Sequence, residues 1–167
     1  MSEMTVTIAA TGDVMIDRDD PNSIFTHVRD RLQNADITLG QLETAYSHKG
    51  PWTHPVHGAQ CRMILELSRN SRAGFDVISL ASNHILDWGW DAVENCQNRL
   101  QADGIEPIGA GEDREAAARP AVMTRSGTRI AFLSFYSVAP DGYYAAAGKP
   151  GIAPMRAITH YEQVEPD

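Results

Sequence analysis

Four polar side chains that could bind a metal ion or move a proton follow three apolar, strand-like runs of this 167-residue chain. They are Asp13, Glu43, Asn83 and His84. Carboxylate and amide oxygens are ligands that suit hard divalent cations. An imidazole beside them can donate a proton to a substrate or stabilise its charge. The set therefore predicts a metal-dependent phosphoesterase-type site.

Each of these residues, taken alone, also fits a purely structural role. Asp13 could close an Asx-turn or cap the next segment. Asn83 could be a capping residue in front of a His84 that belongs to the core. The functional interpretation therefore depends on the repetition of the pattern at three successive strand ends.

Apolar runs predict the strands that would position these side chains. Residues 5–10, 36–42 and 75–84 read as strands, and helical patterns lie between them. This alternation predicts βαβ units, and hence an α/β fold with a largely parallel sheet. Open sheets of this kind carry their chemistry at the carboxyl ends of the strands. We therefore expect the three strand ends to meet at one edge of the sheet.

Other elements follow from apolar spacing and from capping residues. They are a helix that begins near Asp20, a helix over 62–72, a helix from Asp87 as N-cap to Ala102, a strand over 106–109, a short helix capped by Asp113, and a hairpin of residues 122–124 and 129–135. After the hairpin the pattern weakens, and residues 138–167 are expected to form loop or irregular tail.

The loop over 44–60 is long enough to be a functional element rather than a simple connection. Its His57, with Arg62 shortly after it, is the best candidate to contact an anionic substrate. A solvated loop in which Trp52 packs down is the alternative interpretation.

Composition limits the classes of partner. The formal net charge of −8 argues against non-specific binding to nucleic acid or to anionic membranes. No window approaches the ~20 apolar residues of a spanning helix, and the first residues lack the basic and apolar regions of a signal peptide. We expect a cytoplasmic location. Cys61 and Cys96 are expected to be buried free thiols.

Several motifs keep a common order and spacing from about residue 5 to residue 137. They are Gly12-Asp13-Val14-Met15 followed by Arg18, Leu42-Glu43-Thr44, Ser82-Asn83-His84, Asp87-Trp88-Gly89, Gly109-Ala110-Gly111 and Arg119-Pro120. Together they resemble the CapA family, the bacterial capsule and poly-γ-glutamate synthesis proteins with a metallophosphatase-like fold.

The resemblance implies a four-layer αββα sandwich, of which residues 1–167 would form the N-terminal half. It places Asp13, Glu43 and Asn83 at metal-binding positions and His84 beside the metals. Arg18 matches a basic residue after the first motif and joins His57 and Arg62 as a candidate substrate contact. Two divalent cations, of Mn, Fe, Zn or Mg, are implied for the full-length domain.

The sequence also departs from the family pattern. Met15 stands at the histidine position of the metallophosphatase Asp-x-His motif. Two further family segments, His-Trp-Gly and Gly-His-His-Pro-His, are absent from the chain. Three direct ligands are fewer than a pair of cations requires. We therefore expect the chain alone to bind metal weakly and to turn over poorly.

Three functional interpretations follow. The first is a CapA-like metal-dependent hydrolase or transferase of poly-γ-glutamate synthesis, with a small or polymeric anionic substrate, active once the missing part is supplied. The second is a non-catalytic module that binds an anionic polymer. The third is a fragment with an open sheet edge, through which two copies would form a homodimer. Family relatives are often associated with the cell surface.

Overall fold

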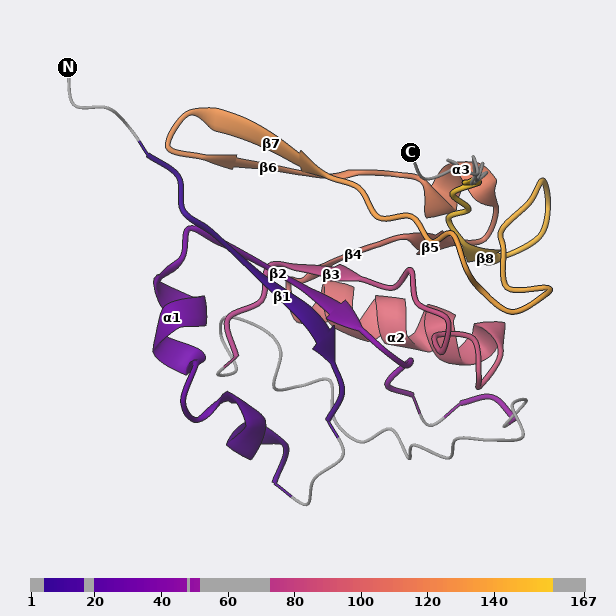
Figure 1. Ribbon diagram of the computed structural model, residues 1–167, viewed down its shortest axis with the longest axis horizontal. Coiled ribbons are helices and arrows are strands. Elements are labelled where there is room, and N and C mark those ends of the chain that lie inside the picture. Colours follow the sequence, from indigo (N-terminus) through magenta and orange to yellow (C-terminus); the bar gives the residue numbers. More distant parts are fainter. Residues whose placement is uncertain (1–4, 17–19, 48, 52–72, 158–167) are drawn as a thin grey trace, which may run out of the picture.

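A parallel four-stranded sheet forms the centre of the protein. The computed structural model describes residues 5–16, 20–47, 49–51 and 73–157 (Figure 1). The strands are β1 (Ile8–Val14), β2 (Ile37–Leu42), β3 (Val77–Ser79) and β4 (Glu106–Ile108), in the order β1-β2-β3-β4. Every neighbouring pair is parallel, which confirms the predicted α/β fold with a largely parallel sheet. Strand β1 stands at one end of this order and leaves an edge of the sheet. A homodimer through such an edge stays a prediction.

Helices cover one face of the sheet. They are the 3-10 helix η1 (Pro21–Phe25), α1 (Arg29–Asn34) and α2 (Trp90–Ala102). Side chains from both layers form the larger core, among them Phe25, Leu32, Ile78, Val93 and Leu100. Cys96 also lies buried in this core, as expected. Cys61 lies outside the described residues. No helix within the described residues is long and apolar enough to cross a membrane.

The helix expected from Asp20 is broken into two short pieces, which corrects the sequence prediction. The hydroxyls of Ser23 and Thr26 donate to the carbonyls of Asp20 and Ser23, at 2.7 and 3.0 Å. Such local bonds compete with the α-helical ladder. The 3-10 turn ends at Phe25, and α1 begins only at Arg29. The helix expected over 62–72 lies outside the described residues.

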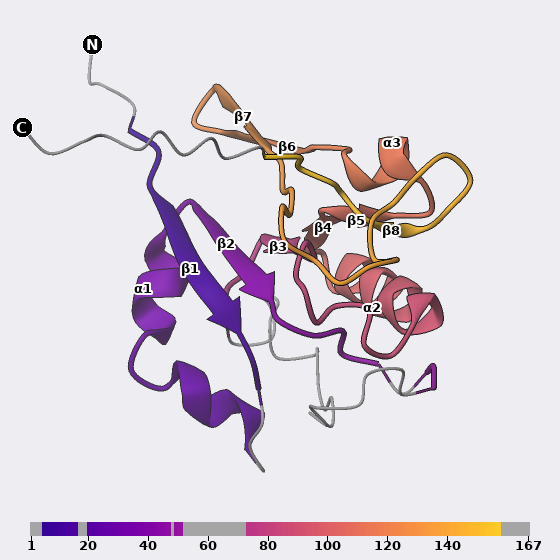
Figure 2. The same cartoon turned by 45° about the vertical axis from the view of Figure 1, so that its right-hand side comes forward.

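A hairpin covers part of the opposite face of the sheet (Figures 1 and 2). Its strands are β6 (Ala121–Arg125) and β7 (Thr128–Phe132), and Ser126 and Gly127 form the turn with φ of 49° and 76°. Two successive positive φ values are typical of the tight turn that suits hairpin twist. A second apolar cluster joins hairpin and sheet, and it consists of Ile37, Val77, Ile108, Ala121 and Phe132. The predicted hairpin is therefore present.

Two short strands and a one-turn helix complete the described part of the chain. Strand β5 (Ala110–Gly111) pairs antiparallel with β8 (Gly151–Ile152), and α3 (Arg114–Ala117) begins after Asp113. The Asp113 carboxylate accepts a hydrogen bond from the Ala116 amide at 2.8 Å, so the predicted cap is present. Strand β8 lies in the region that the sequence predicts as irregular.

Gly40 provides a test of the packing beneath the sheet. A Cβ at this position would lie 2.5 Å from Cε1 of the buried Phe75 and 3.1 Å from Thr11 Oγ1. Phe75 also packs edge-on against Phe25, so its ring has little room to move. We expect Gly40→Ala to lower the free energy of unfolding by about 1–3 kcal/mol, measured by denaturant titration.

Gly12→Ala is the matched control, since a Cβ there meets no atom within 4 Å. Equal stabilities of the two variants would contradict the proposed overpacking at Gly40.

Candidate functional site

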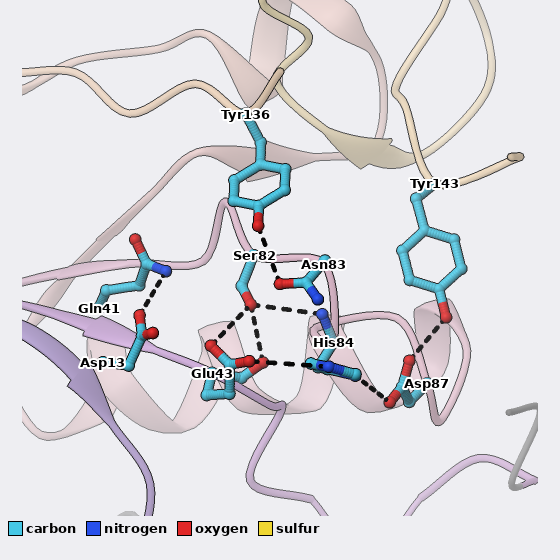
Figure 3. Close-up of polar contacts among 9 residues, drawn as sticks. All are labelled: Asp13, Gln41, Glu43, Ser82, Asn83, His84, Asp87, Tyr136 and Tyr143. Atoms are coloured by element: carbon cyan, nitrogen blue, oxygen red, sulfur yellow. Dashed lines mark hydrogen bonds and ion pairs between the residues drawn. The ribbon is translucent and has the colours of Figure 1, made fainter. Parts of the chain in front are cut away.

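The pairing of β2 with β3 brings two of the predicted site residues together. Gln41 lies opposite Ser79 in this parallel register, and an isolated bridge between Thr44 and His84 continues the same alignment beyond both strands. The Ser82 hydroxyl donates to the backbone carbonyl of Glu43 at 2.9 Å. Glu43 and His84 therefore meet at the carboxyl edge of the sheet, where the sequence predicts them (Figure 3).

Asp13 reaches the same edge from β1. The strand is longer than the sequence predicts, because it continues through Asp13 to Val14 after a shift in register between Ala10 and Asp13. Asp13 lies opposite Gln41, and the Gln41 side-chain amide donates to Asp13 Oδ1 at 2.7 Å. This bond orients the carboxylate at the strand end.

The two carboxylates form a region of excess negative charge. Burial raises the pKa of Glu43, and the charge of Asp13 raises it further. His84 and the Ser82 hydroxyl act in the opposite direction. A bound cation would remove the repulsion between the two carboxylates.

His84 is held between two acidic side chains. Its Nδ1 lies 2.9 Å from Asp87 Oδ2, and its Nε2 lies 3.8 Å from Glu43 Oε1. Asp87 is only 3% exposed, and its Oδ1 accepts a hydrogen bond from the Tyr143 hydroxyl at 2.7 Å. The sequence prediction of Asp87 as a helix N-cap is wrong, because α2 begins at Trp90 after Gly89. The Asp87 carboxylate instead contacts the imidazole of His84 and accepts a hydrogen bond from the phenol of Tyr143.

Asn83 is held by a second tyrosine. The Tyr136 hydroxyl donates to Asn83 Oδ1 at 2.9 Å. Burial raises the pKa of Tyr136, and the charges of Glu43 and Asp13 raise it further, so this hydroxyl lies near both carboxylates. All four residues at the predicted strand ends thus lie at one edge of the sheet (Figure 3).

Sequence reasoning missed both tyrosines. Tyr143 lies in the region over 138–167 that the sequence predicts as loop or irregular tail, and Tyr136 lies just before it. The available signal is the residue type, since a tyrosine with a buried ring usually needs a partner for its hydroxyl. The three candidate substrate contacts Arg18, His57 and Arg62 lie outside the described residues.

The donor atoms at this edge fit one hard divalent cation in type. Asp13 and Glu43 supply carboxylates, and Asn83 supplies an amide oxygen. Mg²⁺ is often held by one or two carboxylates, with water and substrate completing its octahedron. In the described ranges, however, no group of three or more His, Cys, Asp or Glu side chains is arranged to hold a metal ion. The metal therefore stays a prediction.

A cavity of about 160 Å³ is lined in part by β2 and β3. Its walls are Thr11, Leu39, Gly40, Gln41, Ser79, Ile108, Leu133 and Ser134. Gln41 is shared with the site, because its amide bonds Asp13. The hydroxyls of Ser79 and Ser134 lie 2.6 Å apart. The side chains of the cavity wall carry no formal charge, so the cavity suits a neutral polar group.

Comparison with known proteins identifies a family match along nearly the whole chain. The family described as "Bacterial capsule synthesis protein PGA_cap" matches residues 7–167. The protein y4sH of Sinorhizobium fredii is 30% identical over 96% of this chain. The capsule biosynthesis protein CapA of Bacillus anthracis is 23% identical over 95% of it. The PGA biosynthesis protein CapA of Bacillus subtilis is 23% identical over 92%.

These relatives are much longer than the present sequence. The matched region covers 38% of y4sH, 41% of the B. anthracis protein and 43% of the B. subtilis protein. The chain thus spans less than half the length of each relative.

The burial of Glu43 and its repulsion by Asp13 predict a stability that depends on pH. Since the pKa of Glu43 is higher in the folded chain than its ordinary value of 4.5, the folded state binds this proton more tightly. Stability is therefore lost as the pH rises from 4.5 through the folded pKa. With chelator present at pH 7, we expect Glu43→Gln to raise Tm by ~2–4 °C, the shift that corresponds to 1 kcal/mol in a chain of this size.

Differential scanning calorimetry at pH 7 and pH 4 measures this effect, and the gain should shrink at the lower pH. Glu94→Gln, at an exposed position on α2, is the control and should change Tm less. A gain that is the same at both pH values would contradict the electrostatic origin.

Proposed function

Because the chain belongs to the bacterial capsule synthesis protein family PGA_cap, we propose that it forms part of a metal-dependent hydrolase or transferase site that acts in poly-γ-glutamate synthesis. The observation that carries the proposal is the convergence of Asp13, Glu43, Asn83 and His84 at one sheet edge. The names of the two Bacillus relatives, a capsule and a PGA biosynthesis protein, support the choice of polymer.

Asp13, Glu43 and Asn83 are the residues that would hold a cation. A bound divalent cation supplies Lewis-acid polarisation and a more acidic water. The local charge favours this use, because two carboxylates at short range gain from a positive ion between them. The same negative charge would repel the carboxylates of poly-γ-glutamate, so a cation would also assist the approach of an anionic substrate.

His84 is the residue that would exchange a proton with the reacting group. Its Nδ1 side is engaged by the buried Asp87, and its Nε2 side is turned toward Glu43. An imidazole fixed through one nitrogen offers the other in a defined direction. His84 would therefore act as proton donor or acceptor on the side where Asp13 and Glu43 lie.

The metal part of the proposal predicts binding that depends on the carboxylates. We expect Mn²⁺, followed by electron paramagnetic resonance, to bind the chain weakly. Asp13→Asn should weaken that binding about tenfold or more, in line with the effects seen when metal surroundings are altered. Asp91→Asn, at an exposed position on α2, is the control and should bind Mn²⁺ as the unaltered chain does. Equal affinities for all three chains would refute a metal site at Asp13.

Addition of a chelator distinguishes catalysis from simple polymer binding. We expect poly-γ-glutamate to be cleaved or transferred slowly with Mn²⁺ and not at all with EDTA, and His84→Ala should abolish turnover while the polymer still binds. Product size on gels and isothermal titration give the two readouts. Polymer affinity that survives EDTA, without any turnover, would favour the alternative function of a non-catalytic binding module.

A further inference from the structure

Tyr143 lies outside the set of candidate ligands, yet it is firmly placed beside it. Its backbone carbonyl accepts a hydrogen bond from the Ile152 amide of β8 at 2.9 Å. Strand β8 is in turn paired with β5. The tyrosine is therefore bonded to the pair of strands β5 and β8. Figure 3 shows its hydroxyl directed at Asp87.

The two oxygens of Asp87 serve different partners. Oδ1 accepts from the Tyr143 hydroxyl at 2.7 Å, and Oδ2 lies 2.9 Å from His84 Nδ1. Burial raises the pKa of Tyr143 well above its usual value, and the bond to Asp87 raises it further, so the phenol stays a donor. A carboxylate that accepts at both oxygens requires the proton of the neutral imidazole to be on Nδ1. The lone pair of His84 is then on Nε2, the nitrogen turned toward Glu43.

We propose that Tyr143 is a positioning residue, which fixes the rotation of the Asp87 side chain and thereby holds His84 as the Nδ1–H tautomer with Nε2 facing the carboxylate edge. The inference deepens the proposed function, since it concerns the same histidine. It assigns a role to the segment after β7, which supplies no candidate ligand of its own.

The sharpest test replaces Asp87 by asparagine. If Tyr143 still donates to Oδ1, the amide must present its NH₂ group to His84 Nδ1. A donor at that position requires a lone pair on Nδ1, so the proton of the neutral ring moves to Nε2. We therefore expect Asp87→Asn to switch His84 from the Nδ1–H to the Nε2–H tautomer. The measurement is the pair of ¹⁵N imidazole shifts in a long-range ¹H–¹⁵N spectrum at pH 8.5.

A second substitution shows whether Tyr143 causes the switch. In Asp87→Asn combined with Tyr143→Phe, the amide can turn either end toward the ring, so the ratio of Nε2–H to Nδ1–H should fall about fivefold, the factor that one ordinary hydrogen bond corresponds to. Asp87→Asn combined with Tyr144→Phe is the matched control. The Tyr144 hydroxyl belongs to the neighbouring residue and accepts from the Ala139 amide at 2.9 Å, away from Asp87. This control should show the same ratio of Nε2–H to Nδ1–H as Asp87→Asn alone.

Two results would overturn the inference. One is an Asp87→Asn chain that keeps the Nδ1–H tautomer although Tyr143 is present. The other is a Tyr143→Phe combination with the same ratio as Asp87→Asn alone. If the combined variant fails to fold, the single variant still tests the inference, because an Nδ1–H tautomer kept in Asp87→Asn would overturn it. Neither spectrum needs metal or polymer. A chain that binds no Mn²⁺ would therefore refute the proposed metal site without affecting the test of the tautomer.

Discussion

The parallel alignment of β2 with β3 is the constraint on which the candidate site depends. Leu39, Gly40 and Gln41 lie opposite Val77, Ile78 and Ser79. A shift by one residue would move every side chain of a strand to the other face of the sheet. The buried apolar residues of both strands resist such a shift, because they pack against helices on one face and against the hairpin on the other. The apolar core thus sets where Glu43 stands relative to His84.

Sequence reasoning succeeds where a signal is local and repeated. Strands β2 and β3 are largely buried on both faces, and their apolar residues predict central parallel strands. Their polar ends follow directly, so Glu43, Asn83 and His84 can be placed at one edge without a structure. Asp13 is found for the same reason, although β1 extends further than expected. Its register shift depends on pairing with β2, which the sequence of β1 alone does not contain.

The partners of the site could not be predicted because they act across long sequence separations. Asp87 precedes a helix, which is the usual context of an N-cap. One of its carboxylate oxygens instead accepts from the hydroxyl of Tyr143, 56 positions away. Tyr136 and Asn83 are 53 positions apart. Neither tyrosine lies in a periodic stretch, so only the folded arrangement reveals what their hydroxyls contact.

The late position of Tyr143 has a consequence for the order of assembly. A ribosome adds residues from the N-terminus, so the strands that carry Asp13, Glu43 and His84 all emerge before this tyrosine. Contacts of high sequence separation also form late for entropic reasons, because a long loop must close first. The sheet can therefore form while the Asp87 carboxylate still lacks its contact with Tyr143. Only after the segment that follows β7 has folded can Tyr143 donate to Asp87.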